Sequence, residues 1–171
     1  IVGPGGESFE YNNINPQVLG ILIQRVSGKP YSQYLAENLW QQVSEAEGKV
    51  LIDSEQHRIP VTFCCLDAPA RSWLRLGLLH LDGGRVGDRQ VVPADWVAAA
   101  TTRQTSNGSS PTSDWDQGYG YQFWRSRNKS FRGDGAHGQF CMVLPEQDTV
   151  IAMTSGTRNM QGVMNLVWDK L

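Results

Sequence analysis

The sequence has no excess of basic charge, no long apolar run and few residues that bind metals. Its 171 residues include 15 Lys and Arg against 17 Asp and Glu, giving a net charge of -2, so no basic surface is expected for nucleic acid. No segment approaches the roughly 18 consecutive apolar residues of a membrane helix, and no pattern of a secretory signal opens the chain. The length is that of one ordinary domain with a buried core.

Cysteine and histidine are scarce, and each is isolated from residues that could share a metal. Cys64, Cys65 and Cys141 have apolar neighbours, which favours buried free thiols over a disulfide framework or a metal site. No histidine has a ligand partner two to four positions away, which disfavours a metal-dependent hydrolase. His57 and His80 are expected to be structural. We expect neither a metal nor a cofactor.

Residues 1–103 are predicted to be mainly helical. Asn15-Pro16 and Gly28 mark the ends of a helix whose apolar side chains predict a buried position, since proline is favoured in the first helical turn and glycine just past the last. Further helices are expected from Pro30 to Trp40, from Asp67 to Leu81 and over 93–102, with short strands and loops over 50–65.

The second half of the chain has a different character. Residues 104–117 form a polar loop, which is either mobile or the wall of a site. Residues 118–171 predict an antiparallel meander, with strands at 119–124, 140–144 and 149–154, followed by a terminal helix that covers one face of the sheet. Together the three segments predict one incomplete domain of the α/β class, of the α+β kind.

Tyr11 and Asn13 form a Tyr-x-Asn triplet immediately before the first helix. A tyrosine phenol has an ordinary pKa near 10, so it acts as a base at neutral pH only where positive neighbours and hydrogen bonds stabilise the phenolate. The Asn13 carboxamide could orient a lysine through its oxygen and a substrate amide through its nitrogen. The alternative for this short pattern is a turn tyrosine followed by a capping asparagine.

The second candidate is the glycine-dense stretch 133–140. Glycines at a strand edge let a ligand approach the backbone closely, so Gly135, Ala136, Gly138 and Gln139 are expected to bind substrate. His137 could bond a substrate carboxylate or the Tyr11 phenol, or relay a proton. The alternative is a tight hairpin that carries an exposed histidine.

Aromatic residues are frequent over 115–124. Trp115 and Tyr119 are candidates for contact with substrate, although Trp115, Tyr119, Tyr121 and Trp124 could instead pack the core, which we favour. One Ser-x-x-Lys string is present at Ser126–Lys129, but its polar neighbours predict a turn between strands. We therefore do not expect it to be a nucleophile motif.

Several segments occur in a characteristic order: Pro4-Gly5, Tyr11-Asn12-Asn13, Val92-Pro93-Ala94-Asp95-Trp96-Val97, Gly118-Tyr119-Gly120-Tyr121-Gln122-Phe123-Trp124 and Gly135-Ala136-His137-Gly138-Gln139. This order resembles the penicillin-recognising serine hydrolases, which include class C β-lactamases, D-alanyl-D-alanine carboxypeptidases, related esterases and nylon-oligomer hydrolases. It is similar in particular to the 6-aminohexanoate-dimer hydrolase branch.

The resemblance implies an acyl-enzyme mechanism on amide or ester bonds. In the family, the serine of a Ser-x-x-Lys motif attacks the substrate, and the lysine and the tyrosine of Tyr-x-Asn handle the protons. Tyr11 and Asn13 match the second motif, and Ala136-His137-Gly138 is the nearest match to a third, Lys-Thr-Gly motif. This departure favours an esterase, peptidase or amidase over a dedicated β-lactamase.

The resemblance also implies that the nucleophile helix and the first strands lie outside this sequence, which would make the chain the C-terminal half of such an enzyme, inactive alone. The implied partner is the missing N-terminal segment or a second copy of the chain, and the implied substrate is a small molecule or peptide. The alternative is a truncated, inactive binding module of the same fold. Bacterial periplasm and cytoplasm are both compatible with the sequence.

Overall fold

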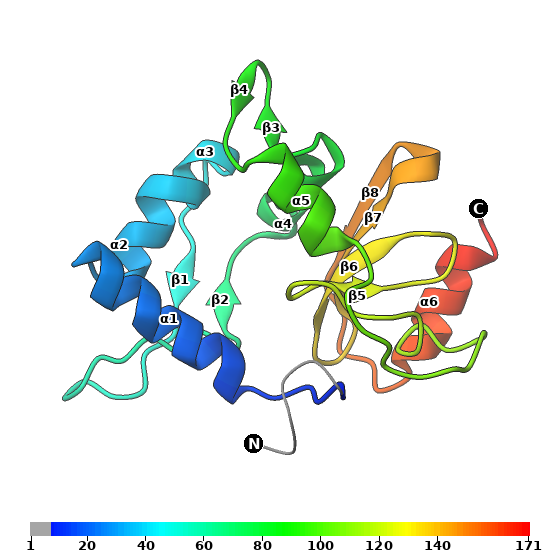
Figure 1. Cartoon of the computed structure of the whole chain (residues 1–171), viewed down its shortest axis with the longest axis horizontal. Helices are drawn as coiled ribbons and strands as arrows, with labels where there is room; N and C mark the ends of the chain where they lie inside the picture. The colour runs from blue at the N-terminus through cyan, green and yellow to red at the C-terminus, as the bar shows by residue number, and fades with distance from the viewer. Residues whose placement is uncertain (1–7) are drawn as a thin grey trace.

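The computed structural model describes residues 8–171, and the turn expected at 3–6 lies outside this range. Two parts lie side by side in Figure 1. The helical part contains α1 (Ile14–Ser27), α2 (Tyr31–Leu35), the π-helical turn η1 (Ala36–Trp40), α3 (Gln41–Val43), β1 (Lys49–Val50) and β2 (Leu66–Asp67). Then follow α4 (Ala70–Leu81), β3 (Arg85–Val86), β4 (Arg89–Gln90) and α5 (Ala94–Thr101).

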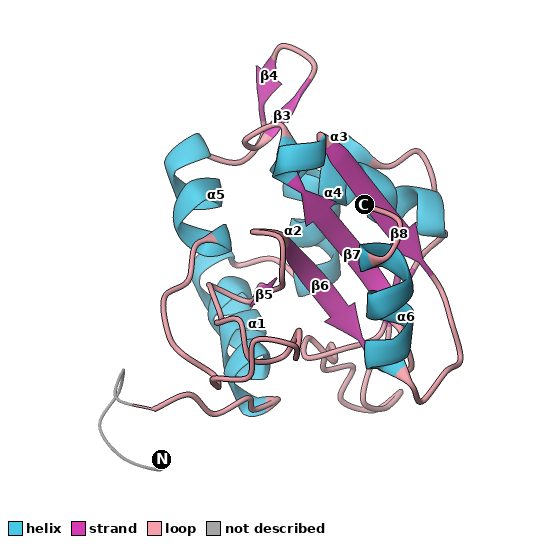
Figure 2. Cartoon of the chain, turned by 90° about the vertical axis from the view of Figure 1, so that its right-hand side faces the viewer, coloured by secondary structure: helices cyan, strands magenta, loops and turns pink. Residues whose placement is uncertain are grey.

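The other part is an antiparallel sheet with a terminal helix. The strands β5 (Trp124–Arg125), β6 (Phe131–Gly135), β7 (Gln139–Leu144) and β8 (Thr149–Met153) follow one another in space as in sequence, and η2 (Pro145–Gln147) links the last two. The helix α6 is Met160–Trp168. Figure 2 shows α6 in front of the sheet and α4 behind it. The α+β class is confirmed, and none of the helices within residues 8–171 is long and apolar enough to cross a membrane.

The predicted meander is correct in kind and wrong in its first strand. Residues 119–123 form a bend with isolated bridges at Tyr119, and Gln122 has a φ of 67°, which interrupts an extended strand. Only Trp124 and Arg125 of that region belong to a strand, and they pair with Arg132 and Phe131 in β6. The strand β6 was missed because its glycines suggested a turn rather than a strand.

The face of the sheet that α6 covers contains the hydrophobic core. Phe140, Met142 and Leu144 alternate along β7, so they share one face, and all three are buried together with Met164 of α6. The expectation that the terminal helix covers the sheet is confirmed.

The opposite face of the sheet packs closely against α4. A Cβ added at Gly77 would lie 2.4 Å from Cγ1 of Val150 and 2.9 Å from Sγ of Cys141, so only glycine allows this approach. Cys141 is a free, half-buried thiol that donates to the carbonyl of Trp73. Burial raises the pKa of the Cys141 thiol to about 11.

The other two cysteines correct the expectation of buried free thiols. Cys64 and Cys65 are joined by a disulfide, and both are exposed. Their apolar neighbour Phe63 is itself exposed, because this loop runs along the surface before β2. Apolar neighbours in the sequence were therefore a poor guide to burial here.

Helix α1 differs from its prediction in both its start and its burial. It begins at Ile14, and the Asn12 side chain accepts a hydrogen bond from the Ile14 backbone, so the cap precedes the expected Asn15-Pro16. Gly20, which faces Thr62, is its one buried residue. The apolar residues Ile14, Val18, Leu19, Leu22 and Val26 are exposed. The helix was expected to be buried, but no described segment covers this side of it.

The polar loop 104–117 is fixed by one buried carboxylate. Asp114 accepts hydrogen bonds from Arg127, from Gln161 and from the indole of Trp168. Burial by itself raises the pKa of Asp114, but these bonds together hold that pKa below its ordinary value. The loop is thereby tied both to α6 and to the turn that connects β5 with β6.

We expect Gly77→Ala to lower the free energy of unfolding by about 1–3 kcal/mol, because the added methyl group overpacks the contact between α4 and the sheet. Gly133→Ala is a matched control, since nothing lies within 4 Å of its added Cβ. Urea unfolding should show that adding Val150→Ala to Gly77→Ala costs less than the sum of the single changes. Full additivity would argue against the close contact.

We expect Asp114→Asn to lower the free energy of unfolding at pH 7 by about 3 kcal/mol, because the amide removes a buried charge partner of Arg127. The folded-state pKa of Asp114 is lowered, so its stabilisation is present above the unfolded pKa and is lost as pH falls through the folded value. The difference from wild type should therefore shrink below about pH 4 in urea unfolding. Asp169→Asn, at an exposed position, should show neither effect.

Candidate active site

Tyr11 lies in the extended segment just before α1, with its side chain against an aromatic cluster. The Tyr11 ring centre is 5.1 Å from that of Trp124 and 6.1 Å from that of Tyr119. Phe9 contacts the same two rings at 5.8 and 5.0 Å. Tyr11 is nevertheless 56% exposed, so the cluster holds the ring on one side and leaves the phenol open to another molecule.

Tyr119 is half-buried, in contrast to the exposed Tyr11. Burial raises the pKa of the Tyr119 phenol above its ordinary value, and the nearby Tyr11 and Asp134 raise it further. Tyr119 therefore stays a neutral phenol across the physiological pH range. Of the two adjacent tyrosines, the accessible one is Tyr11.

A buried cation lies behind the aromatic cluster. Arg132 on β6 is fully buried, and its guanidinium carbon is 5.7 Å from the ring centre of Trp124 and 4.7 Å from that of Trp115. This is the distance range of cation–π attraction. Trp124 thus contacts the Arg132 guanidinium on one side and the Tyr11 ring on the other. Trp115 serves the core here, as the packing alternative expected.

Asp134, two positions along β6, forms an ion pair with Arg132 through a 2.8 Å contact between Oδ2 and Nη2. Burial raises the pKa of Asp134, and the charge of Arg132 opposes this rise. The Asp134 charge also raises the pKa of the Tyr119 phenol. A buried charged pair thus contacts Trp124, which in turn contacts the Tyr11 ring.

The glycine-dense stretch is the hairpin between β6 and β7. Gly135 pairs with Gln139, and residues 136–138 form the turn. His137 and Gly138 have φ values of 65° and 81°, a left-handed conformation that costs a histidine more than a glycine. The alternative expectation of a tight hairpin with an exposed histidine is confirmed as a structure, and the role of His137 in substrate binding stays a prediction.

The members of the hairpin differ in exposure. Gly138 is buried against Ser155 and Thr157, whereas Ala136, His137 and Gln139 are exposed. The Gln139 side chain donates to the carbonyl of Ala136 within the turn. Within residues 8–171, no side-chain hydrogen bond or aromatic contact joins His137 to Tyr11.

Asn13 is the N-cap residue of α1 and is exposed. Its carboxamide makes no capping hydrogen bond, because Asn12 supplies that contact. The side chain of Asn13 therefore does not serve the helix start, which leaves it available two positions from Tyr11. The alternative that the Asn13 side chain caps the helix is wrong, because Asn12 makes that hydrogen bond.

The Ser-x-x-Lys string is a turn, as its neighbours predicted. Ser126 is buried and accepts a hydrogen bond from Arg132, while Lys129 is exposed and pairs with Glu146. Asn128 and Lys129 both have positive φ values. Ser126 and Lys129 thus point to different partners, and the string has no catalytic geometry. Among the described residues, no group of three His, Cys, Asp or Glu side chains could hold a metal.

The structure brings Tyr11 together with Tyr119. Trp115 is connected to them only indirectly, because Arg132 contacts both Trp115 and Trp124. Sequence reasoning missed Phe9, Trp124 as a direct neighbour of Tyr11, and the buried pair of Arg132 and Asp134. The available signal was the i, i+2 spacing of that pair, which places both side chains on one face of a strand. It was not used because the segment had not been recognised as a strand.

Comparison with known proteins concerns the chain as a whole. No family model matches the chain. The 6-aminohexanoate-dimer hydrolase of Paenarthrobacter ureafaciens is 30% identical over 175 residues, covering 95% of this chain and 44% of the relative. A solved structure of a putative 6-aminohexanoate-dimer hydrolase from Bacillus anthracis superposes with a TM-score of 0.84 at 22% identity, covering 99% of this chain and 45% of that one.

A β-lactamase of Mycobacterium bovis superposes with a TM-score of 0.72 at 17% identity, covering 99% of this chain and 66% of that chain. The chain shares the fold of these solved structures. It is similar in sequence to the 6-aminohexanoate-dimer hydrolase and spans less than half the length of that relative. The family resemblance expected from the sequence is confirmed.

If the Tyr11 phenol is available for chemistry rather than for stability, Tyr11→Phe should change the free energy of unfolding by less than about 0.5 kcal/mol. Trp124→Ala should cost about 3 kcal/mol or more, because it removes the ring between Arg132 and Tyr11. Guanidinium unfolding monitored by circular dichroism measures both. A large loss for Tyr11→Phe would mean that its hydroxyl is structural.

Proposed function

We propose that this chain is the C-terminal portion of a serine hydrolase that cleaves amide or ester bonds through an acyl-enzyme. In this proposal, Tyr11 and Asn13 belong to the catalytic machinery, and a segment outside this sequence supplies the Ser-x-x-Lys nucleophile. The observation that carries the proposal is the exposed Tyr11 phenol, held by an aromatic cluster at the start of a helix whose apolar side is open.

A role of Tyr11 in proton transfer would require a cation beside its exposed phenol. A phenol becomes a useful base only when a cation lowers the energy of its phenolate, and no described lysine or arginine contacts Tyr11 on its exposed side. In this proposal, the lysine that the family resemblance implies would lie there, next to the nucleophilic serine. Tyr119 would remain a neutral phenol beside it, because its own pKa is raised.

The open side of α1 supports the location of the missing nucleophile. Ile14, Val18 and Leu22 recur every four residues, so they form one apolar stripe that starts next to Asn13. A helix that packed on this stripe would lie beside Tyr11 and Asn13. A nucleophile helix seated there would place its serine within reach of the phenol.

The hairpin at 135–139 is proposed to bind the substrate backbone, with His137 in the place of the lysine of the third family motif. Gly135, Ala136, Gly138 and Gln139 would offer main-chain groups to an amide or ester, and such groups can also stabilise an oxyanion. A 6-aminohexanoate oligomer, as the name of the homologue indicates, is one candidate substrate. Esters and short peptides are the others.

The test uses a fluorophosphonate, which labels activated serines. The 171-residue chain is incubated with the part of the Paenarthrobacter ureafaciens hydrolase outside the matched region, and intact masses are measured. We expect an adduct on the second polypeptide only when both are present. Tyr11→Phe should slow labelling by about 10²-fold or more, as expected for loss of a general acid or base.

The matched control is Tyr121→Phe, at an exposed tyrosine that stacks on Trp96 rather than on Tyr11. It should leave the labelling rate within about twofold. An adduct on this chain itself, or equal loss in both variants, would contradict the assigned roles. Binding of substrate without any labelling would instead favour an inactive binding module.

A further inference from the structure

A disulfide between neighbouring residues lies in the loop before β2. Cys64 and Cys65 are bonded at a sequence separation of 1, and both residues are exposed. The chain-entropy stabilisation of a disulfide grows with the number of residues that it encloses, so a bond between neighbours hardly restricts the unfolded chain. Exposed disulfides are also the labile and regulatory ones, because an attacking thiolate must reach a sulfur. The Cys64–Cys65 bond is therefore better suited to reversible chemistry than to holding distant segments together.

Cys65 has an unusual backbone conformation. Its φ of 72° lies in the left-handed region, which costs a residue with a side chain more than a glycine. This angle sets the direction in which residues 62–64 leave β2, while the Cys65 carbonyl accepts a hydrogen bond from the Leu51 backbone at 3.1 Å. Such a conformation persists only where its surroundings hold it, and the closed disulfide ring is one such constraint. Reduction removes that constraint from Cys65.

The segment that contains the disulfide holds the first turn of α1. This cysteine segment, residues 60–66, runs beside α1 (Figure 1). The Thr62 hydroxyl donates to the carbonyl of Pro16 at 2.8 Å, and the Thr62 backbone N–H donates to Oε1 of Gln17 at 3.0 Å. In return, Nε2 of Gln17 donates to the carbonyl of Pro60 at 2.9 Å. Hydrogen bonds in both directions thus join the cysteine segment to two consecutive residues of α1.

The same turn of α1 directly follows the candidate active site, because Pro16 comes shortly after Tyr11 and Asn13 in the chain. The cysteine segment and α1 also touch closely at Gly20, where an added Cβ would lie 2.5 Å from Cγ2 of Thr62. A new direction of residues 62–64 therefore has to shift the start of α1 or break the hydrogen bonds of Thr62. Either change alters how the residues before α1 are held.

We propose that the Cys64–Cys65 pair is a redox modification site whose reduction loosens the first turn of α1. Tyr11 and Asn13, which precede that turn, are then displaced. The reductant is a dithiol: one of its thiolates attacks a sulfur of the pair, and its second thiol resolves the mixed disulfide. The S–S bond of the chain breaks, both cysteines become thiols, and the dithiol becomes a disulfide. Two electrons and two protons thus pass to the chain.

The consequence for catalysis rests on the proposed function, whereas the loosening of α1 does not. With the bond closed, the cysteine segment holds the start of α1 and so fixes Tyr11 and Asn13 relative to a serine from outside this sequence. A displacement of about 1 Å can slow an enzymatic reaction by about 10²-fold. The oxidised chain is therefore the active form.

The first measurement is amide hydrogen exchange of the chain before and after reduction with dithiothreitol, a small dithiol. Alkylation and peptide masses should place new thiols on Cys64 and Cys65 of the folded chain. We expect the Leu51 and Thr62 amides to exchange about tenfold faster or more. The Leu51 amide donates to Cys65 itself, and the Thr62 amide reports the contact with α1.

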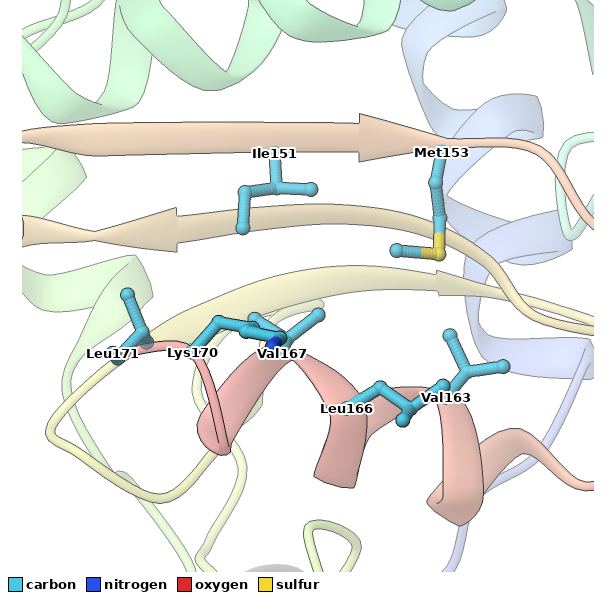
Figure 3. Close-up of a pocket in the computed structure, with 7 residues that line it drawn as sticks. All are labelled: Ile151, Met153, Val163, Leu166, Val167, Lys170 and Leu171. Carbon is cyan, nitrogen blue, oxygen red and sulfur yellow. The ribbon is translucent and has the colours of Figure 1, made fainter.

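The strand β8 is the internal control. Figure 3 shows Ile151 and Met153 of this strand directed toward α6, so its amides report the sheet rather than the cysteine segment, and their exchange should not change. Faster exchange in β8 as well would make the bond a support of the whole fold and would overturn the proposal. Unchanged exchange at Thr62 after reduction would overturn it too, as would a bond that dithiothreitol reduces only in the unfolded chain.

The matched variant is Cys64→Ser/Cys65→Ser, which cannot form the bond and changes the side chains little in size. It should exchange like the reduced chain, and dithiothreitol should leave its exchange unchanged. An effect of dithiothreitol on this variant would show that the reductant acts elsewhere, and would contradict the assignment to the Cys64–Cys65 pair.

Serine labelling separates this proposal from the proposed function. The chain is mixed with the part of the Paenarthrobacter ureafaciens hydrolase outside the matched region, and fluorophosphonate labelling is timed. We expect the oxidised chain to support labelling about tenfold faster or more than the Cys64→Ser/Cys65→Ser variant. Equal rates would overturn control of the site by the pair and leave the proposed function standing. No labelling with either chain, together with faster exchange at Thr62 on reduction, would contradict the proposed function and leave the loosening of α1 standing.

Discussion

The buried guanidinium of Arg132 is the interaction on which the rest of the sheet region depends. It donates to the carbonyl of Asp114 and to the hydroxyl of Ser126, and it pairs with Asp134. A fully buried cation without partners would be very costly, so each of these contacts has to be kept in the folded state. The polar loop, the turn after β5 and the indole next to Tyr11 are thereby fixed relative to one another.

Much of the fold could be predicted because helix ends and hairpins have local signals. Gly28 ends α1 with a φ of 67°, as a glycine after a helix should, and the strands predicted at 140–144 and 149–154 correspond to β7 and β8. The start of α1 could not be placed as well, because Asn12, Asn13 and Asn15 are all plausible caps. Only the geometry of the folded turn chooses among them.

The candidate site was only partly predictable from the sequence. Tyr11 and Asn13 carry a recognisable pattern, but their neighbours Trp124 and Asp134 lie more than 110 residues later in the chain, and no local rule connects them. The exposure of Val18 and Leu22 could not be predicted either. An apolar stripe predicts that one side of a helix is buried, but it does not indicate which polypeptide covers that side. Leu166 on α6 is likewise apolar and exposed, and its sequence position does not indicate what covers it.

The reactivity of the Cys141 thiol depends on how tightly α4 packs on the sheet. It is the free cysteine of the described chain, it lies at the tight contact between Gly77 and the sheet, and its raised pKa makes it a poor nucleophile in the closed state. We therefore expect reaction with an alkylating reagent to be faster when α4 separates from the strands. The rate of alkylation would therefore report the rate of this local opening without any introduced label.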